Sequence, residues 1–172
     1  VRDTKPEVRI AALERLANAV DVRHMSASQR ATVATFGLGD RDTACHNVAV
    51  GLVQKWATSL DNRVPKLLQL MGMTRVQNAS AVELVGNALI DIVENAGNNP
   101  FPASHGLKSA VRDDKPKWDG EVGQLSASEI LWAQLRCEYA RKNFAPAAAE
   151  EIMSHLVPDM VVICTQLAAA HS

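Results

Sequence analysis

Two thin series of basic side chains are the residues of this sequence with the clearest chemistry. In chain order they are Arg23, His24, Arg30 and Arg41, and then Lys55, Arg63, Lys66 and Arg75. The first four fall at the ends of expected helices and in the turn between them, where a guanidinium reaches a phosphate and a helix N-terminus adds N–H donors. The pattern indicates a surface for a phosphate backbone. The alternative interpretation is ordinary solvated charge.

The charge of the chain is uneven along its length. Residues 1–80 carry 11 Lys/Arg against 7 Asp/Glu, and residues 81–172 carry 7 against 12, so the halves are +4 and −5 and the net charge is −1. Such an asymmetry is typical of a protein with a basic binding surface in one half, although solvated helix faces also produce it.

No constellation of residues in the sequence predicts catalysis, a metal or a cofactor. The five histidines share no metal-ligand spacing with one another or with cysteine. Cys45 and His46 are neighbours on an expected helix and point about 100° apart, which excludes a nucleophile–base pair. The stretch Gly37-Leu38-Gly39 lacks the remaining spacing of a phosphate loop. We therefore expect a protein that is not an enzyme.

The cysteines, the apolar runs and the first residue of the chain indicate the cellular setting of the protein. Three distant cysteines, Cys45, Cys137 and Cys164, suggest no disulfide framework and fit a reducing cytosolic or nuclear compartment. No apolar run reaches the roughly 18 residues of a membrane span, so we expect no membrane partner. Because the chain begins at Val1 without an initiator Met, we expect it to be a fragment of a longer protein.

Helical periodicity predicts the elements that position these side chains. Apolar residues spaced three and four apart predict a helix from Pro6 to Val20, a second over 28–38 and a third through Trp56. Asp3 and Asp40 stand 37 positions apart, and sliding the chain by that interval aligns apolar positions. Repeats of roughly 40 residues made of two antiparallel helices are typical of HEAT and armadillo solenoids.

This repeat predicts roles for particular residues. Asp3 and Asp40 are expected in the turns between helices, and Arg9 is expected to bond to an Asp of the neighbouring unit rather than to a ligand. His46 takes the position of Arg9 in the next unit. Trp56 and Trp132 are expected in the core, because each lies at helical spacing with aliphatic residues.

The whole chain is predicted to be an all-α, superhelical α-solenoid of antiparallel helix pairs. Residues 1–95 form about two and a half HEAT units, the third of which begins with Asp61 and Asn62 capping a helix through Met71. Residues 96–125 break every period and predict a mobile, exposed loop. Residues 126–172 form further HEAT-type helices, the last two near 146–156 and 158–170.

Several stretches, in order, resemble the HEAT-repeat G subunit of condensin. They are Asp21 to Arg30, Gly37 to Asp42, Val53 to Trp56, Asn62 to Met71, Val82 to Leu89, and Leu125 to Tyr139. Their order is more specific than any one of them, since HEAT repeats converge. The chain departs from the pattern at Ala44-Cys45-His46, where a Val-Arg or Val-Lys pair is more usual.

The resemblance implies a non-catalytic subunit that grips the kleisin subunit of condensin (the CAP-H type) and, with it and other condensin subunits, binds double-stranded DNA through its backbone. It implies a role in mitotic chromosome condensation, in the nucleus and on chromosomes, and in the cytoplasm for part of the cell cycle. The alternative is a generic HEAT or armadillo interaction scaffold, of the importin, adaptin or phosphatase-scaffold type, with no nucleic-acid role. Salt-dependent duplex binding distinguishes the two.

Overall fold

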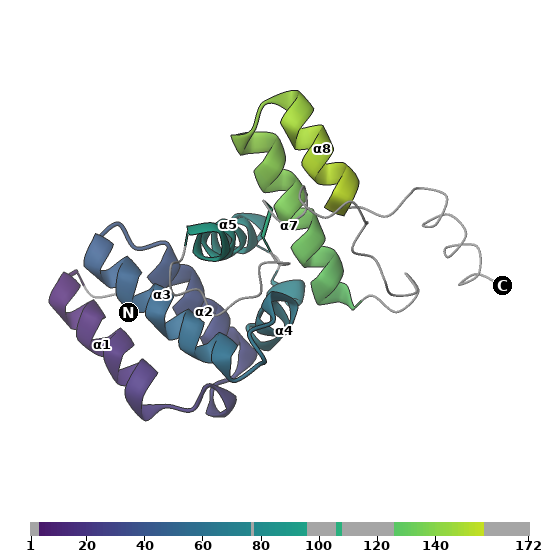
Figure 1. The fold of residues 1–172 in the computed structure, drawn as a ribbon. Coiled ribbons are helices and arrows are strands. Elements are labelled where there is room, and N and C mark those ends of the chain that lie inside the picture. The colour runs from purple at the N-terminus through teal and green to yellow at the C-terminus, as the bar shows by residue number, and fades with distance from the viewer. Residues whose placement is uncertain (1–3, 77, 96–105, 108–125, 157–172) are drawn as a thin grey trace.

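The computed structural model of the 172-residue chain describes residues 4–76, 78–95, 106–107 and 126–156. Within these ranges every regular element is a helix and none is a strand (Figure 1). The prediction of an all-α fold is confirmed for this part of the chain. Asp3, Cys164 and the expected helix over 158–170 lie outside it.

The first four helices each begin at a proline or directly after a side chain that caps the free N–H groups of the first turn. They are α1 (Pro6–Ala19), the short 3-10 helix η1 (Val22–His24), α2 (Ala27–Leu38) and α3 (Thr43–Thr58). Pro6 opens α1, where the lack of an N–H has no cost.

Two polar side chains satisfy free N–H groups where the next helices begin. Ser26 opens α2 with a capping box, in which the Gln29 N–H donates to Ser26 Oγ at 3.2 Å and the Ser26 N–H donates to Gln29 Oε1 at 2.8 Å. Asp42 caps α3 by accepting the Cys45 N–H at 3.0 Å.

The helices α1, α2 and α3 form the first packed group, with α3 lying against both of the others (Figure 1). Leu13 of α1 is fully buried between them. Gly37 lets α2 approach α3 closely, because a Cβ on this glycine would lie 2.7 Å from Ala49 Cβ. The two helix backbones are therefore nearer than most side chains would permit.

The segment that follows α3 differs from the sequence-based expectation. It holds α4 (Val64–Leu70) and the 3-10 helix η2 (Met73–Arg75). Asp61 and Asn62 both have φ of +56°, and neither caps α4, whose N-cap is Arg63. The predicted capping role is wrong because the Asp61 carboxylate instead accepts a hydrogen bond from the Lys66 ammonium at 2.7 Å.

The later helices complete the core. Helix α5 (Ala79–Asn95) packs chiefly on α2 and on α7 (Ala127–Asn143), and α8 (Pro146–Leu156) folds back on α7. Figure 1 shows α5 end-on beside α1–α3, so it crosses them steeply. Because α7 packs against both α4 and α5, the third helix pair does not simply repeat the second. A regular superhelix therefore remains a prediction.

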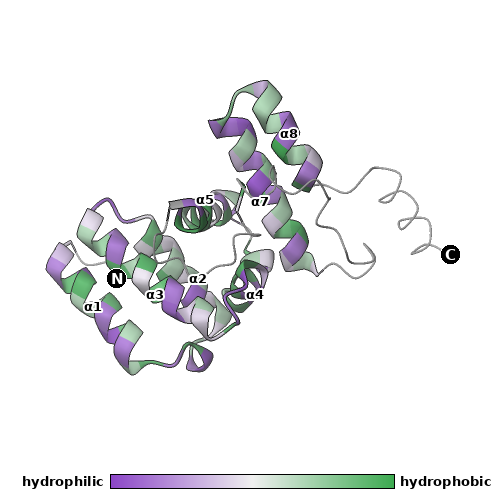
Figure 2. Ribbon diagram, viewed as in Figure 1, coloured by the Kyte–Doolittle hydropathy of each residue, from purple (hydrophilic) through white to green (hydrophobic). Residues whose placement is uncertain are grey.

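The core runs through all of these helices. Trp56 and Trp132 are buried at 4% and 2% exposure, as expected. Figure 2 shows hydrophobic and hydrophilic residues alternating along the helices, which is typical of helices with one buried face.

The segment expected to be an exposed loop is buried at the one point that the structure describes. Leu107 is 1% exposed, and its N–H donates to the carboxylate of Glu94 in the last turn of α5. At Gly106 and Leu107 the prediction of an exposed loop is therefore wrong, because the core accepts this leucine. The rest of 96–125 lies outside the described residues.

Candidate nucleic-acid interface

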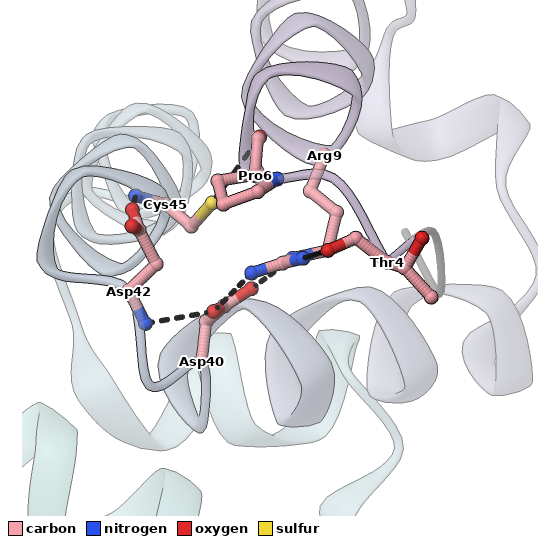
Figure 3. Close-up of polar contacts among 6 residues, drawn as sticks. All are labelled: Thr4, Pro6, Arg9, Asp40, Asp42 and Cys45. Atoms are coloured by element: carbon pink, nitrogen blue, oxygen red, sulfur yellow. Dashed lines mark hydrogen bonds and ion pairs between the residues drawn. The ribbon is translucent and has the colours of Figure 1, made fainter.

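A bidentate ion pair joins α1 to the turn before α3 (Figure 3). Arg9 Nε donates to Asp40 Oδ2 at 2.7 Å and Arg9 Nη2 donates to Asp40 Oδ1 at 2.9 Å, while Nη1 reaches the carbonyl of Thr4. The sequence predicts a bond from Arg9 to a turn aspartate, and the structure contains it; that it links successive repeats of a solenoid remains a prediction.

Burial and charge act together in this network. The hydrogen bond from Arg9 lowers the pKa of the Asp40 carboxyl, and Asp40 in turn raises the pKa of Arg9. Burial raises the pKa of the neighbouring Cys45 thiol, whose Sγ donates to the Pro6 carbonyl. These groups stay in their ordinary protonation states and hold one another in place, so the cluster is structural.

Seven of the eight predicted binding residues gather at one end of the helices, which we call the basic end and define as residues 17–30 and 55–75. The Lys55 ammonium donates to the carbonyl of Ala17, which places the last turn of α3 against the last turn of α1. A hollow of about 400 Å³ between them is lined by both Arg23 and Lys55.

The α4–η2 segment lies at the same end. A Cβ built on Gly72, between α4 and η2, would lie 3.0 Å from the Cβ of Ala27, the first residue of α2. Arg75 follows three residues later, and Arg63 opens α4. The basic end therefore joins parts of the chain that are up to 58 positions apart in sequence.

The balance of charge at the basic end is positive. Its two ranges contain six Lys or Arg residues and two Asp residues, Asp21 and Asp61, and Glu129 of α7 places a third carboxylate beside Arg63. The field of such a surface attracts polyanions and raises their association rate.

The basic side chains differ in how far the protein already engages them. Arg30 Nη1 donates to the carbonyl of Val22 at 3.1 Å, while its Nε is buried without a partner among the described residues. Arg63 lies 3.7 Å from a Glu129 carboxylate oxygen, and Lys66 pairs with Asp61. These interactions orient the cations and partly neutralise them.

Three members of the basic end keep their side chains available. Arg23, His24 and Arg75 are exposed, and within the described part of the chain none of their side chains has a hydrogen bond or an ion pair. Arg23 and Arg75 are therefore the best candidates for binding phosphates.

Arg41 does not join the others. It lies in the turn after α2, next to Asp40, whereas η1 precedes α2. A helix of 12 residues is about 18 Å long. The structure thus divides the predicted set into the basic end and one separate, exposed arginine.

Sequence reasoning missed a second concave surface, where α5 crosses α2 and α3. Its volume is about 730 Å³. One signal was present: His46, Val50 and Gln54 repeat at four-residue spacing on α3, and Ser80, Glu83 and Asn87 begin a similar stripe on α5. The sequence does not say that these two stripes meet.

Over the residues that the structure describes, no group of three or more His, Cys, Asp or Glu side chains is placed to hold a metal. No helix in that part is long and apolar enough to cross a bilayer. Comparison of the chain with family models, with curated proteins and with solved structures found no match.

Proposed function

We propose that this chain is part of a non-catalytic HEAT-repeat subunit of the condensin G type, which binds a kleisin chain and double-stranded DNA. The observation that carries the DNA-binding half of this proposal is the basic end, where η1, α2, α3, α4 and η2 bring six cations together. Two of its arginines have no partner within the described residues. The ordered series of condensin-like stretches supports the kleisin half. The helices continue, on this proposal, as a superhelical row of antiparallel pairs.

The chemistry of the basic end favours phosphate binding over base readout. Exposed arginines at helix ends reach phosphate oxygens, and these interactions position a protein on a duplex without reading sequence. Each neutralised phosphate releases condensed counterions, so the affinity depends on several cations together and falls as salt rises.

Charge reversal at the basic end tests this proposal. We expect Arg23→Glu with Arg75→Glu to weaken duplex binding equally for unrelated DNA sequences, measured by fluorescence anisotropy in the kleisin-bound subunit. A matched control reverses the same charge elsewhere: Arg41→Glu with Arg141→Glu, both exposed and away from the basic end.

Comparing the two double variants separates the effect of where the charges lie from the effect of the protein's net charge on DNA affinity. The proposal requires the first pair to weaken binding well beyond the second, with kleisin binding and the helical circular dichroism signal retained in both. Surface substitutions of this kind change stability by only about 0.5 kcal/mol each. Equal weakening by both pairs, or none by either, contradicts a DNA surface at the basic end.

A second candidate function is a protein-interaction scaffold without a nucleic-acid role. The concave surface between α5 and the α2–α3 pair favours it, because its lining contains no Lys or Arg among the described residues. If duplex binding by the kleisin-bound subunit is absent at low salt, this second function replaces the first.

A further inference from the structure

The concave surface missed by the sequence, which we call the α3–α5 hollow, has an apolar floor and an acceptor-rich rim. Val50 from α3 and Leu84 and Ala88 from α5 supply floor positions, and Glu83 and Asp91 supply two carboxylates. The hollow opens to solvent rather than closing over its contents.

Three polar side chains of the rim are held in place by neighbours, and Gln54, Ser80 and Asn87 add groups that can both donate and accept. The Lys142 ammonium donates to Glu83, and Tyr139 Oη donates to Asp91 Oδ1 at 2.7 Å. Because a carbonyl oxygen only accepts, the 2.9 Å hydrogen bond between His46 Nδ1 and the Leu38 carbonyl places the proton on Nδ1. In neutral His46 the remaining nitrogen, Nε2, is therefore an acceptor.

We infer that the α3–α5 hollow docks a short segment of a protein partner, one that places an aliphatic side chain on the floor and Lys or Arg side chains on the rim. Charge complementarity favours this occupant: among the described residues two carboxylates and no Lys or Arg line the hollow. In the part of the chain that the structure describes, the one cation that pairs with them, Lys142, neutralises Glu83 alone, so Asp91 leaves the rim with a net negative charge that a partner's Lys or Arg complements. The same lining repels phosphates, which makes nucleic acid a poor fit.

The position of the hollow separates it from the basic end. The hollow runs along α3 from His46, in its first turns, to Gln54, which directly precedes Lys55 of the basic end. Because neighbouring residues on a helix point about 100° apart, the two surfaces lie on different faces of α3. A partner segment and a DNA duplex therefore meet the chain on different surfaces. This inference does not depend on DNA binding.

The shape of the hollow also favours a peptide over a small molecule. Small-molecule sites bury most of their ligand in an enclosed cavity, whereas this surface is an open crossing between helices. Amphipathic segments bind such surfaces through apolar anchors at three- and four-residue spacing.

A designed peptide tests the inference on the full chain. The probe is a helical peptide of about three turns, with Leu on one face and Lys elsewhere, carrying a fluorophore and one photoreactive leucine analogue. The comparison peptide has Glu in place of each Lys. We expect the Leu/Lys peptide to bind and to cross-link to α3 and α5, and the Leu/Glu peptide to bind about tenfold more weakly or worse.

Two matched double variants test whether the charge dependence of peptide binding comes from the carboxylates of the hollow. Glu83→Gln with Asp91→Asn removes both rim carboxylates and keeps their hydrogen-bond acceptors, and we expect the affinity to fall about fivefold, as for two partly exposed charge pairs. Glu7→Gln with Glu14→Gln removes the same charge from exposed positions on α1 and should leave the affinity unchanged.

Three results overturn the inference. They are cross-links confined to helices outside the hollow, equal weakening by the two double variants, and the absence of binding by the Leu/Lys peptide. A fourth result would also overturn it: sedimentation of the free chain shows a dimer, and the α5 residues that line the hollow are protected from chemical labelling in that dimer. The occupant of the hollow would then be a second copy of this chain.

Discussion

The close approach of α2 and α3 at Gly37 allows a sharp test of the packing. Replacing a helix-interior glycine with alanine favours the helix by about 1 kcal/mol. At Gly37 the new methyl would lie 2.7 Å from Ala49 Cβ, which is fixed to the backbone of α3, so the helices must move apart. Overpacking of this kind costs about 1–3 kcal/mol. We expect Gly37→Ala to be neutral or destabilising by up to about 2 kcal/mol.

Gly51 provides the matched control, because it lies inside α3 and a Cβ there would meet no atom within 4 Å. Gly51→Ala should stabilise by about 1 kcal/mol, so the difference between the two variants, about 1–3 kcal/mol, isolates the clash with Ala49. Urea unfolding followed by circular dichroism measures both.

Exchanging the two small residues tests the packing directly. In the double variant Gly37→Ala with Ala49→Gly, the destabilisation should be smaller than the sum of the two single effects, because the methyl group then has space. A Gly37→Ala variant as stable as Gly51→Ala would refute the close packing of α2 on α3.

Three further predictions concern burial and ionisation. Leu13→Ala should lower the free energy of unfolding by about 2–5 kcal/mol, whereas Val8→Ala, at a 47% exposed position, should change it by less than about 0.5 kcal/mol, both measured by urea unfolding. The lowered pKa of Asp40 means that its ion pair stabilises the fold above the ordinary carboxyl pKa of about 4 and that this stabilisation disappears as pH falls through the folded value. The urea concentration at the midpoint of unfolding should therefore fall less for Asp40→Asn than for the parent when the pH is lowered from about 6 to about 3, a range that spans the ordinary carboxyl pKa. Tyr139 is the one tyrosine of the chain, and its hydrogen bond to Asp91 raises its pKa to about 12. An ultraviolet absorbance titration should report this value, and Asp91→Asn should return it toward about 10; a parent value near that ordinary one contradicts the hydrogen bond.

Local signals in the sequence account for most of the helices. Ser26 and Ser126 each precede a Gln or Glu by three residues, and both form capping boxes. The Arg9–Asp40 bond was also predictable, because a repeat offset places an arginine opposite a turn aspartate. These features depend on spacing alone.

The errors arise where tertiary packing decides the outcome. Asp61 lies two residues before the N-cap of α4, which is Arg63, and its carboxylate pairs with Lys66 instead of capping the helix. Leu107 is a single apolar residue in a polar segment, so no periodicity marks its burial. The packing of α5 on α2 and α7 joins helices that are distant in sequence, which spacing within each helix does not encode.

The candidate interface could be predicted only in part, because tertiary packing also decides which basic side chains come together and which are already engaged. The sequence identifies the basic side chains, and the structure gathers seven of them and separates Arg41. Spacing cannot show that Lys55 and Arg30 are engaged by backbone carbonyls, or that Arg23 and Arg75 have no partner within the described residues.

The salt dependence of duplex affinity tests the central claim, that the basic end binds DNA through phosphates. The measurement compares the slope of log affinity against log salt for the kleisin-bound parent subunit and for Arg23→Glu with Arg75→Glu, on two duplexes of unrelated sequence. We predict the same steep slope on both duplexes for the parent. In the variant the slope should be shallower by roughly 0.9 for each phosphate that is no longer neutralised, or about 1.8 for two. An unchanged slope in a folded, kleisin-binding variant would contradict the claim, and the positive charge of the basic end would then be a solvated surface.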